Sequence, residues 1–332
     1  MQVLVTGGAG FLGSALVRRL VLLGHDVRVI DDLSAGDPAR LPDEASFSRG
    51  DVNDLPRLWS LLQGVECVYH LAARVSVPES VQYPREYNAV NVGGTVSVLE
   101  AVRDVGVKRL VFVSSGAIYG NQAAQPVSES LPPHPASPYA VSKLSAEQYV
   151  KTIGQLWKVE TVCLRVFNAY GPDQQIPVSH PPVIPHFIHT ALGNGSLVVH
   201  GNGQQTRDFV FLDDVINALI AAATAPGVDR QVINVGSGVE TSINDLIQHI
   251  EKVLARDVYP LYVDSQNAGV QRLSADLTLA RDLLGYKPQV FLEEGLRRVV
   301  LEDGRFSNKP KWTAPRSLTT TWPNGVREEE VE

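Results

Sequence analysis

Residues 3–14 read VLVTGGAGFLGS, and this stretch decides the fold that the rest of the chain completes. A short apolar run ends just before three regularly spaced glycines, and a helical stretch, Phe11–Leu23, follows. The glycines are Gly7, Gly10 and Gly13. Glycines at such a place let the backbone turn tightly and approach a pyrophosphate at the positive end of a helix. The pattern predicts a strand, a nucleotide-binding turn and a helix, with a plain glycine-rich turn as the alternative.

An acidic residue ends the second strand-like run. Asp31 follows Val27–Ile30, 24 residues after Gly7, and Asp32 comes next. A carboxylate at this place accepts hydrogen bonds from ribose hydroxyls and repels a 2′-phosphate. Because no arginine stands beside either acid, we expect NAD rather than NADP as the cofactor. An ordinary strand-end acid is the alternative.

Strand-like and helical runs alternate through the first half of the chain. The strand-like runs are Val3–Val5, Val27–Ile30, Ser46–Arg49, Cys67–Leu71, Leu110–Val113 and Thr161–Leu164. The helical runs include Phe11–Leu23, Leu55–Leu62, Val90–Val105 and Pro138–Ile153. Continuously apolar strands separated by helices are typical of a parallel sheet covered on both faces. We therefore expect an α/β fold with a doubly wound parallel (Rossmann) sheet.

The rhythm changes after Arg165. The proline-rich residues 171–185 predict a long irregular loop. Shorter elements follow near Asp213–Ala225, Val232–Val235 and Ser242–Leu254. They predict a smaller C-terminal α/β lobe that binds substrate over the carboxyl edge of the sheet. The expected division is 1–165 mainly cofactor-binding domain, 166–306 mainly substrate lobe with the chain crossing back at least once, and 307–332 peripheral tail.

Composition limits the classes of function. The chain has 332 residues, 44% hydrophobic and 20% charged, with a formal net charge of −7. Basic residues form no run longer than a pair, which argues against a nucleic-acid partner or an anionic-membrane surface. Cys67 and Cys163 lie in apolar runs and predict no disulfide framework. With no signal sequence and no apolar run of the ~18 residues that a membrane helix needs, we expect a cytoplasmic protein.

Polar residues with catalytic potential follow the strand Leu110–Val113. Ser114 and Ser115 stand where it ends, and ligands of open α/β sheets bind beyond the carboxyl ends of strands. Tyr139 and Lys143 occur in SPYAVSK, four apart on one helix face. An ammonium beside a phenol favours the phenolate and lowers its pKa, which would make Tyr139 a usable base. A capping serine and a chance Tyr–Lys pair are the alternatives.

These motifs resemble those of the extended short-chain dehydrogenase/reductase family, and within it the NAD-dependent nucleotide-sugar epimerases typified by UDP-glucose 4-epimerase. The resemblance extends from VTGGAGFLGS to RLSADLTLARDLLGYKP. It rests on GGAGFLG, the pair Asp51 and Val52, HLAA at 70–73, VSSGAIYG, YAVSK, LRVFNAYGP and TRDFVFLDD. It implies epimerisation of a nucleotide-activated hexose at C4 through a transient 4-keto sugar, with NAD retained between turnovers.

The resemblance also implies roles for individual residues. Tyr139 would be the acid and base on the sugar 4-hydroxyl, Lys143 would bind the nicotinamide ribose, and Ser115 would hydrogen-bond the 4-oxygen. The implied cofactor-binding residues are Gly7, Gly10, Phe11, Leu12, Gly13, Asp31, Asp32, Asp51, Val52, Leu71, Ala72, Ala73, Asn91, Tyr139 and Lys143. The implied substrate-binding residues are Ser115, Tyr139, Asn168, Val183, Arg207, Arg272 and Leu273. Arg207 also suits phosphate by its own chemistry, with a surface pair to Asp208 as the alternative.

Several positions bear on the reaction and the sugar. Gly116 and Ala117 stand where the 4,6-dehydratases of the family carry an acidic pair, which argues against dehydration. Between Arg165 and Arg207 there is no lysine or arginine to pair with a uronic acid, which favours a neutral hexose or N-acetylhexosamine. An epimerase or dehydratase acting on a dTDP-sugar or a UDP-uronic acid is the alternative.

Two departures leave the sugar open. Gln266 replaces an arginine that the family uses at the diphosphate, and Arg272 stands nearby. Leu273 occupies a position where a small residue admits N-acetyl groups and tyrosine excludes them. Leucine is intermediate in size, so UDP-glucose and UDP-N-acetylglucosamine both remain candidate substrates.

Two other classes of protein fit parts of the pattern. A non-catalytic NAD-binding regulator would share the fold but typically lose a catalytic residue, and all three are present. A metal site would use His180, His186 and His189, but no carboxylate or cysteine lies at ligand spacing, so we expect no metal. Family members commonly dimerise through two helices per subunit, here Val90–Val105 and Glu147–Trp157, and a homodimer is expected.

Overall fold

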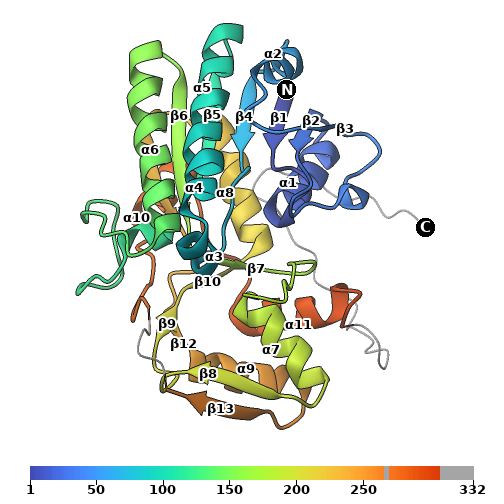
Figure 1. Ribbon diagram of the computed structural model, residues 1–332, viewed down its shortest axis with the longest axis vertical. Coiled ribbons are helices and arrows are strands. Elements are labelled where there is room, and N and C mark those ends of the chain that lie inside the picture. Colours follow the sequence, from blue (N-terminus) through green and yellow to red (C-terminus); the bar gives the residue numbers. More distant parts are fainter. Residues whose placement is uncertain (265–268, 307–332) are drawn as a thin grey trace.

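The computed structural model of the protein describes residues 1–264 and 269–306 (Figure 1). A central sheet with helices on both faces forms the larger part of the molecule, and a smaller lobe lies beyond one edge of the strands. The expectations for Gln266 and for the tail 307–332 fall outside the described residues.

The central sheet has seven strands, all parallel, in the order β11-β6-β5-β4-β1-β2-β3. They are β1 (Gln2–Thr6), β2 (Asp26–Asp31), β3 (Ser46–Arg49), β4 (Cys67–His70), β5 (Arg109–Ser115), β6 (Glu160–Val166) and β11 (Gln231–Val235). The order reverses between β1 and β4, and in such sheets ligands bind outside the carboxyl ends of the strands at the reversal. The predicted doubly wound α/β fold is confirmed.

Helices cover both faces because the strands are apolar on both sides. Val3 and Val5 of β1 belong to the apolar cluster on one face, whereas Leu4 belongs to the cluster on the other. The covering helices are α1 (Phe11–Leu22), α8 (Leu212–Thr224) and α10 (Thr278–Leu284) on the first face, and α2 (Leu55–Leu62), α5 (Gly94–Val105) and α6 (Pro138–Trp157) on the second. With both faces covered, the carboxyl edge of the sheet is left for ligands.

The smaller lobe surrounds an apolar cluster of its own. Its elements are α7 (Val183–Leu192), β8 (Ser196–His200), α9 (Ile243–Leu254), β13 (Tyr259–Val263) and α11 (Leu292–Glu302). Two short strand pairs accompany it: β7 (Asn168–Tyr170) with β10 (Phe209–Phe211), and β9 (Thr206–Arg207) with β12 (Thr241–Ser242). The chain crosses back to the sheet in between, so α8 and β11 lie against α1 and β6 rather than in the lobe.

The helix predicted over Val90–Val105 starts earlier and is interrupted. α4 (Pro84–Asn88) continues through a π-helical turn, η2 (Ala89–Gly93), before α5 begins. Such turns are frequent at functional sites because they re-aim a side chain. Here the turn carries Asn91, which is 1% exposed and is aimed at the loop after β4. The remaining short helices are η1 (Pro38–Arg40), α3 (Val77–Gln82) and η3 (Gly116–Tyr119).

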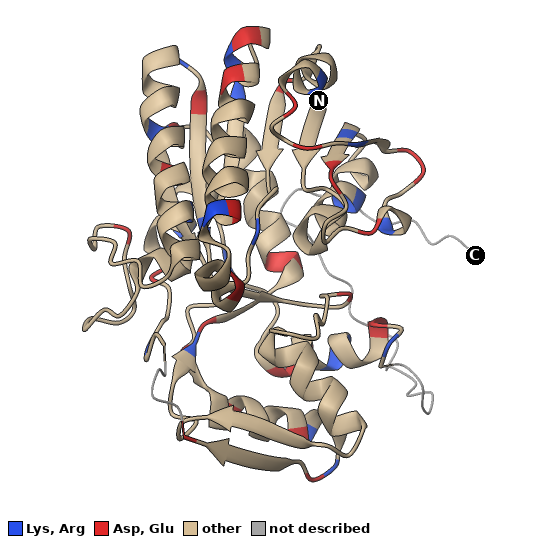
Figure 2. Cartoon of the chain, viewed as in Figure 1, with Lys and Arg blue, Asp and Glu red and all other residues tan. Residues whose placement is uncertain are grey.

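The structure shows where the charged residues, the apolar helices and the cysteines lie among the described residues. Basic and acidic residues are interspersed along the ribbon (Figure 2). Within residues 1–264 and 269–306, no helix is both long and apolar enough to cross a membrane. Cys67 and Cys163 are both buried and free.

Candidate active site

The turn after β1 forms a cradle in which Gly7 and Gly13 leave no room for a side chain. Gly7 has a φ of +68°, and a Cβ there would lie 2.7 Å from the backbone nitrogen of Ala72. A Cβ on Gly13 would lie 2.1 Å from the carbonyl oxygen of Gly7. Gly10 caps the start of α1, whose first N–H groups have no partner within the helix. Backbone and helix terminus are therefore open to a pyrophosphate, which fits NAD.

Asp31 lies at the end of β2 with its carboxylate turned toward this cradle. One oxygen accepts the N–H of Ala9 at 3.0 Å and the other accepts the N–H of Leu33 at 2.8 Å. Burial raises the pKa of Asp31, and these hydrogen bonds oppose the rise. Asp32 is exposed and accepts the backbone N–H and hydroxyl of Ser34. Of the two predicted acids, Asp31 is thus the one held at the glycine-rich turn.

The other residues expected at the cofactor also follow strand ends. Asp51, exposed after β3, accepts the backbone and side-chain N–H groups of Asn53, and Val52 beside it is 5% exposed. Leu71 and Ala72 follow β4 and donate their backbone N–H groups to Thr6. Phe11 and Leu12 begin α1, Ala73 lies in the loop after β4, and all three are half-buried. The fold therefore brings the predicted set to the carboxyl edge around β1.

A buried hydrogen-bond chain crosses the sheet under this edge. His70 is fully buried, with Nδ1 2.7 Å from the Thr6 hydroxyl and Nε2 3.0 Å from the Thr95 hydroxyl. Thr95 donates to the carbonyl of Asn91, so its oxygen is free to accept from Nε2, and Nδ1 accepts from Thr6. This assigns a neutral imidazole. Burial, together with the charge of Lys143, lowers the pKa of His70 to about 3.

The neutral state of His70 predicts acid sensitivity. An unfolded histidine has a pKa of about 6.5, so the unfolded chain binds a proton that the folded chain excludes. Stability is fully present above about pH 6.5 and should fall by about 3 kcal/mol at about pH 4.5 through this residue. Urea unfolding at both pH values measures the loss. His70→Gln should show a smaller loss than the exposed-site control His200→Gln, and equal losses would contradict the assignment.

The three predicted catalytic residues converge at the ends of β5 and α6. Ser115 ends β5, and Tyr139 and Lys143 lie one turn apart at the start of α6, all three buried. The Ser115 hydroxyl lies near enough to the Tyr139 phenol to lower its pKa. Ser80 of α3 accepts the backbone N–H of Tyr139 at 3.0 Å, and the Lys143 ammonium lies 4.4 Å from the centre of the Phe112 ring. The arrangement joins a hydroxyl, a phenol and an ammonium.

Burial, rather than the neighbouring ammonium, dominates the pKa of Tyr139. Burial raises this pKa, and the hydrogen bond to Ser115 opposes the rise. The expectation that Lys143 brings the pKa of Tyr139 below its ordinary value is therefore wrong for this structure. The lysine is itself desolvated: burial lowers the pKa of Lys143 to about 7, while Cys163 and Glu147 act to raise it. A lysine that titrates near neutral pH can exchange protons readily with its surroundings.

Asn91 braces this region from the π-helical turn. Its amide nitrogen donates to the hydroxyl of Ser142 at 2.9 Å and to the carbonyl of Arg74 at 3.0 Å, and its amide oxygen accepts the N–H of Arg74 at 2.8 Å. Ser142 lies between the two catalytic residues of α6. Asn91 was predicted among the cofactor contacts. Its hydrogen bonds also give it a structural role, because they connect the loop after β4 to α6.

Arg207 faces the lobe without an acidic partner among the described residues. Its guanidinium donates to the carbonyls of Thr206 and Val270, and burial lowers its pKa. Asp208, its suspected partner, is fully buried and accepts the N–H groups of Ser237 and others nearby instead. The alternative of a surface pair with Asp208 is therefore wrong, and the arginine has donors to spare for an anion.

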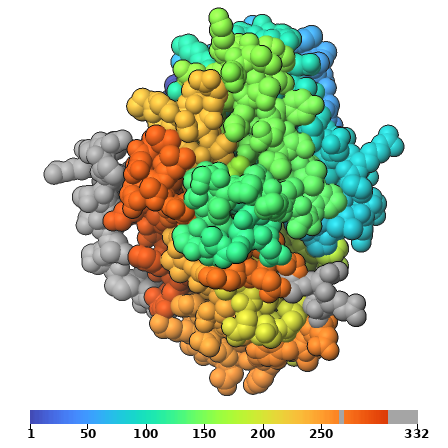
Figure 3. Space-filling model, turned by 90° about the vertical axis from the view of Figure 1, so that its left-hand side faces the viewer, coloured from blue at the N-terminus to red at the C-terminus, as the bar shows by residue number. Residues whose placement is uncertain are grey.

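The remaining predicted substrate residues are spread around the lobe. Asn168 is exposed at the start of β7, and Val183 is the first residue of α7. Arg272 forms a two-point ion pair with Glu240, at 2.7 Å for each contact. Leu273 is 5% exposed. It packs with Ile118, Tyr119, Val127, Phe167 and Ala275. In Figure 3 the loop after η3, in green, lies against the orange segment that carries Leu273.

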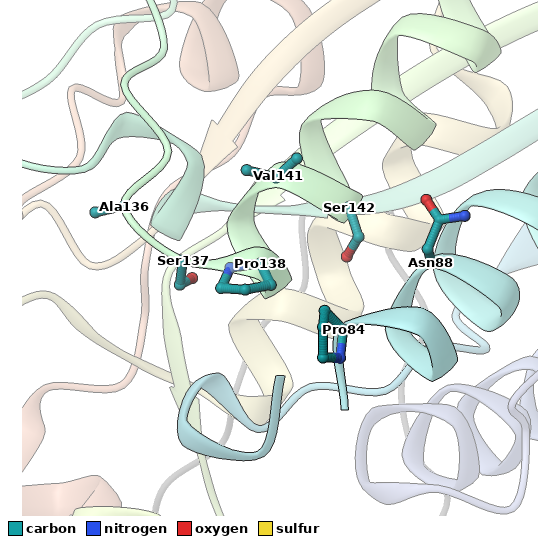
Figure 4. Close-up of a pocket in the computed structure, with 7 residues that line it drawn as sticks. All are labelled: Pro84, Asn88, Ala136, Ser137, Pro138, Val141 and Ser142. Atoms are coloured by element: carbon teal, nitrogen blue, oxygen red, sulfur yellow. The ribbon is translucent and has the colours of Figure 1, made fainter. Parts of the chain in front are cut away.

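Two further features lie apart from the catalytic residues. A pocket of about 530 Å³ opens between α4 and the first turn of α6, lined by Pro84, Asn88, Ala136, Ser137, Pro138, Val141 and Ser142 (Figure 4). Its lining includes neither Tyr139 nor Lys143. His186 and His189 lie on α7, and the described part of the chain holds no group of three or more His, Cys, Asp or Glu side chains that could bind a metal.

Sequence reasoning missed several residues that support the site. Ser80, Thr6 and Thr95 act through hydrogen bonds across the fold, and no local pattern signals them. Glu147 had a usable signal, because it lies four residues after Lys143 and shares its helix face. It is fully buried, which a carboxylate tolerates when it is paired.

Fold and site together define a dinucleotide-binding enzyme of the short-chain dehydrogenase/reductase type. The NAD dependent epimerase/dehydratase family matches residues 3–236, and the chain belongs to this family. NAD is therefore the cofactor.

Individual proteins of known name are similar over nearly the whole chain. UDP-glucose 4-epimerase of Mycolicibacterium smegmatis is 38% identical over 307 residues, 90% of this chain and 97% of the relative. The crystal structure of UDP-glucose 4-epimerase from Thermotoga maritima with UDP-glucose superposes with a TM-score of 0.87 at 35% identity, covering 91% and 98%. UDP-N-acetylglucosamine 4-epimerase from Methanobrevibacter ruminantium, in complex with UDP-N-acetylmuramic acid, has a TM-score of 0.85 at 35% identity, covering 90% and 96%.

Proposed function

We propose that the protein interconverts the 4-epimers of a UDP-activated neutral hexose, with UDP-glucose and UDP-galactose as the first candidates. The observation that carries the proposal is the convergence of three buried side chains: Ser115 at the end of β5, and Tyr139 and Lys143 one turn apart at the start of α6. Gly116 and Ala117 after the serine supply no acid for dehydration. The similar proteins act on UDP-sugars, which supports the same class of substrate here.

The chain's own residues divide the work of the reaction. NAD, held by the glycine turn after β1 and by Asp31, would supply the hydride acceptor and donor for C4 of the sugar. Tyr139 removes the proton of the 4-hydroxyl in its phenolate form, with Ser115 holding the same oxygen, and gives the proton back at the end. Lys143, with its pKa near 7, holds positive charge by the phenol while the proton is transferred. The 4-keto sugar must turn over between the two steps, so the site binds the nucleotide more firmly than the sugar ring.

Arg207 is the residue that we expect to anchor the nucleotide. Its half-buried guanidinium lacks an acidic partner among the described residues, and the two phosphates of the nucleotide can supply that negative charge. Charge-assisted hydrogen bonds contribute about 1.5–3 kcal/mol, so Arg207→Met should raise KM by roughly 10–100-fold. Arg272→Met is the matched comparison, and it should raise KM less because Glu240 already pairs with Arg272. Steady-state kinetics decides, and a larger effect at Arg272 would contradict this assignment.

A neutral hexose is favoured over a uronic acid. Residues 166–206, which include the loop before α7, contain no lysine or arginine that could pair with the carboxylate of a uronic acid. Leu273 is enclosed by apolar neighbours, which supports a substrate without a charged group at that side. UDP-N-acetylhexosamine and dTDP-hexose remain the competing substrates and are separated by experiment.

The test uses purified protein without added NAD. UDP-glucose, UDP-N-acetylglucosamine, UDP-glucuronic acid and dTDP-glucose are each incubated with it, and the 4-epimers are followed by anomeric proton NMR. Conversion of UDP-glucose to an equilibrium mixture supports the proposal, because hydride is taken up and returned within one turnover. Conversion of another substrate alone would move the assignment to that sugar, and no conversion by NAD-containing protein would overturn 4-epimerisation.

We also propose a homodimer formed through α5 and α6. Val141, Tyr149 and Leu156 are 49%, 46% and 70% exposed, and they recur every seven or eight residues along α6. Such spacing places them on one face, where a second copy could cover them. Light scattering that gives the mass of one chain would overturn the dimer.

Cytoplasmic location is supported by the two free, buried cysteines.

A further inference from the structure

A buried ion pair lies just behind the catalytic residues and has no part in the mechanism described above. Glu147 of α6 is fully buried and Arg165 of β6 is 4% exposed. Nε of Arg165 donates to one carboxylate oxygen of Glu147 at 3.0 Å, and a terminal nitrogen donates to the other at 2.7 Å. Desolvating two charges is costly, so a buried pair is weak evidence of a stabilising role and invites another explanation.

The pair holds both ends of the segment that carries Ser115. Before it, the hydroxyl of Ser114 donates to Glu147 at 2.7 Å. After it, Arg165 donates to the hydroxyl of Tyr119 at 2.8 Å and stacks 4.8 Å from the centre of that ring. Ser115 and η3 lie between these two attachments. Glu147 itself is part of α6, the helix that presents the phenol and the ammonium of the site.

The pair therefore connects the two halves of the catalytic group. We propose that Glu147 and Arg165 are positioning residues: they set the segment of Ser115 against the helix face of Tyr139 and Lys143. The proposal rests on the proposed function for its catalytic consequence, whereas its effect on the titration of Tyr139 does not require a known substrate.

Four variants distinguish an effect on the position of the catalytic residues from an effect of charge and from an effect on stability. Glu147→Gln removes the charge but leaves Arg165 buried without its partner. Glu147→Leu combined with Arg165→Met removes both charges at similar volume, a change that buried pairs often tolerate without loss of stability. Glu147→Asp keeps the charge on a shorter side chain and tests rescue. Glu160→Gln is the control, because it breaks an ion pair with Arg109 at the other end of β6.

Three readouts apply to every variant: kcat against pH, NAD content, and ultraviolet titration of Tyr139 as the difference from the same protein with Tyr139→Phe. We expect Glu147→Gln and the double variant to keep NAD and to lose kcat by about 10²-fold. Tyr139 should then titrate at higher pH, because a displaced Ser115 no longer lowers the pKa of the phenol. Glu147→Asp should restore part of each change, and Glu160→Gln should change none.

A double variant with unshifted Tyr139 titration would overturn the proposal, whether or not its kcat falls, because the pair would then act on stability alone. An unfolded single variant leaves the double variant to decide. If the wild-type protein epimerises no sugar, the proposed function fails, but the Tyr139 titration still confirms or overturns the positioning role.

Discussion

Replacing Tyr139 by phenylalanine is expected to lower the rate of epimerisation by about 10²–10⁴-fold while NAD stays bound. The substitution removes one hydroxyl, the group that exchanges a proton with the sugar 4-oxygen. The ring can remain in place because Tyr87 packs against it edge-on at 6.5 Å and Ser80 holds its backbone N–H. The glycine cradle and Lys143 are untouched, so cofactor binding should persist. Anomeric proton NMR measures the rate, and absorbance after denaturation measures the NAD content.

The matched control is Tyr259→Phe, which removes a hydroxyl from a tyrosine that is 64% exposed on β13. It should change neither quantity. A Tyr139→Phe protein with wild-type activity would show that another group, with Ser115 as the first candidate, transfers the proton. A wild-type protein that binds NAD but converts no nucleotide sugar would favour the non-catalytic regulator instead.

Much of the fold could be predicted because its signals are local. α2 occupies the predicted bounds, Leu55–Leu62, since Asp54 caps its start and accepts the N–H of Arg57. The predicted run Ser46–Arg49 is β3. The partners of later elements could not be predicted in the same way. β11 was visible as an apolar run, but its pairing with β6 depends on a crossover that no single stretch encodes.

The residues of the site fall into the same two groups: those with a local sequence signal and those whose properties depend on packing. The glycine turn and the Tyr139–Lys143 spacing are local patterns, and the structure places both at one edge of the sheet. The direction of the Tyr139 pKa depends on burial by residues from other elements, so the expected lowering was wrong. Arg207 could be chosen for its charge, yet its lack of pairing with Asp208 depends on N–H groups that follow β11 and precede α10. Sequence indicates which groups are present, and packing decides their protonation.

Substituting alanine for Gly13 should abolish NAD retention and destabilise the fold at once. The added Cβ would lie 2.1 Å from the carbonyl oxygen of Gly7 and 2.6 Å from the Cα of Gly8, and backbone atoms cannot yield as a flexible side chain can. The clash forces α1 away from the turn, at a cost of about 1–3 kcal/mol or more. Since NAD needs that turn intact, its affinity should fall by roughly 10²-fold or more.

Gly10→Ala is the comparison that separates packing from cofactor contact. A Cβ on Gly10 would lie 3.2 Å from the Gly7 carbonyl oxygen, and that backbone has no positive φ. Its apo stability should therefore stay close to wild type, whereas NAD content should fall because the second glycine of such a turn faces the pyrophosphate. Urea unfolding of NAD-free protein and NAD quantification give both values. If Gly13→Ala retained NAD, α1 would not be held against the turn as the structure describes. If Gly10→Ala retained NAD, the pyrophosphate would have to approach the sheet elsewhere than at the start of α1.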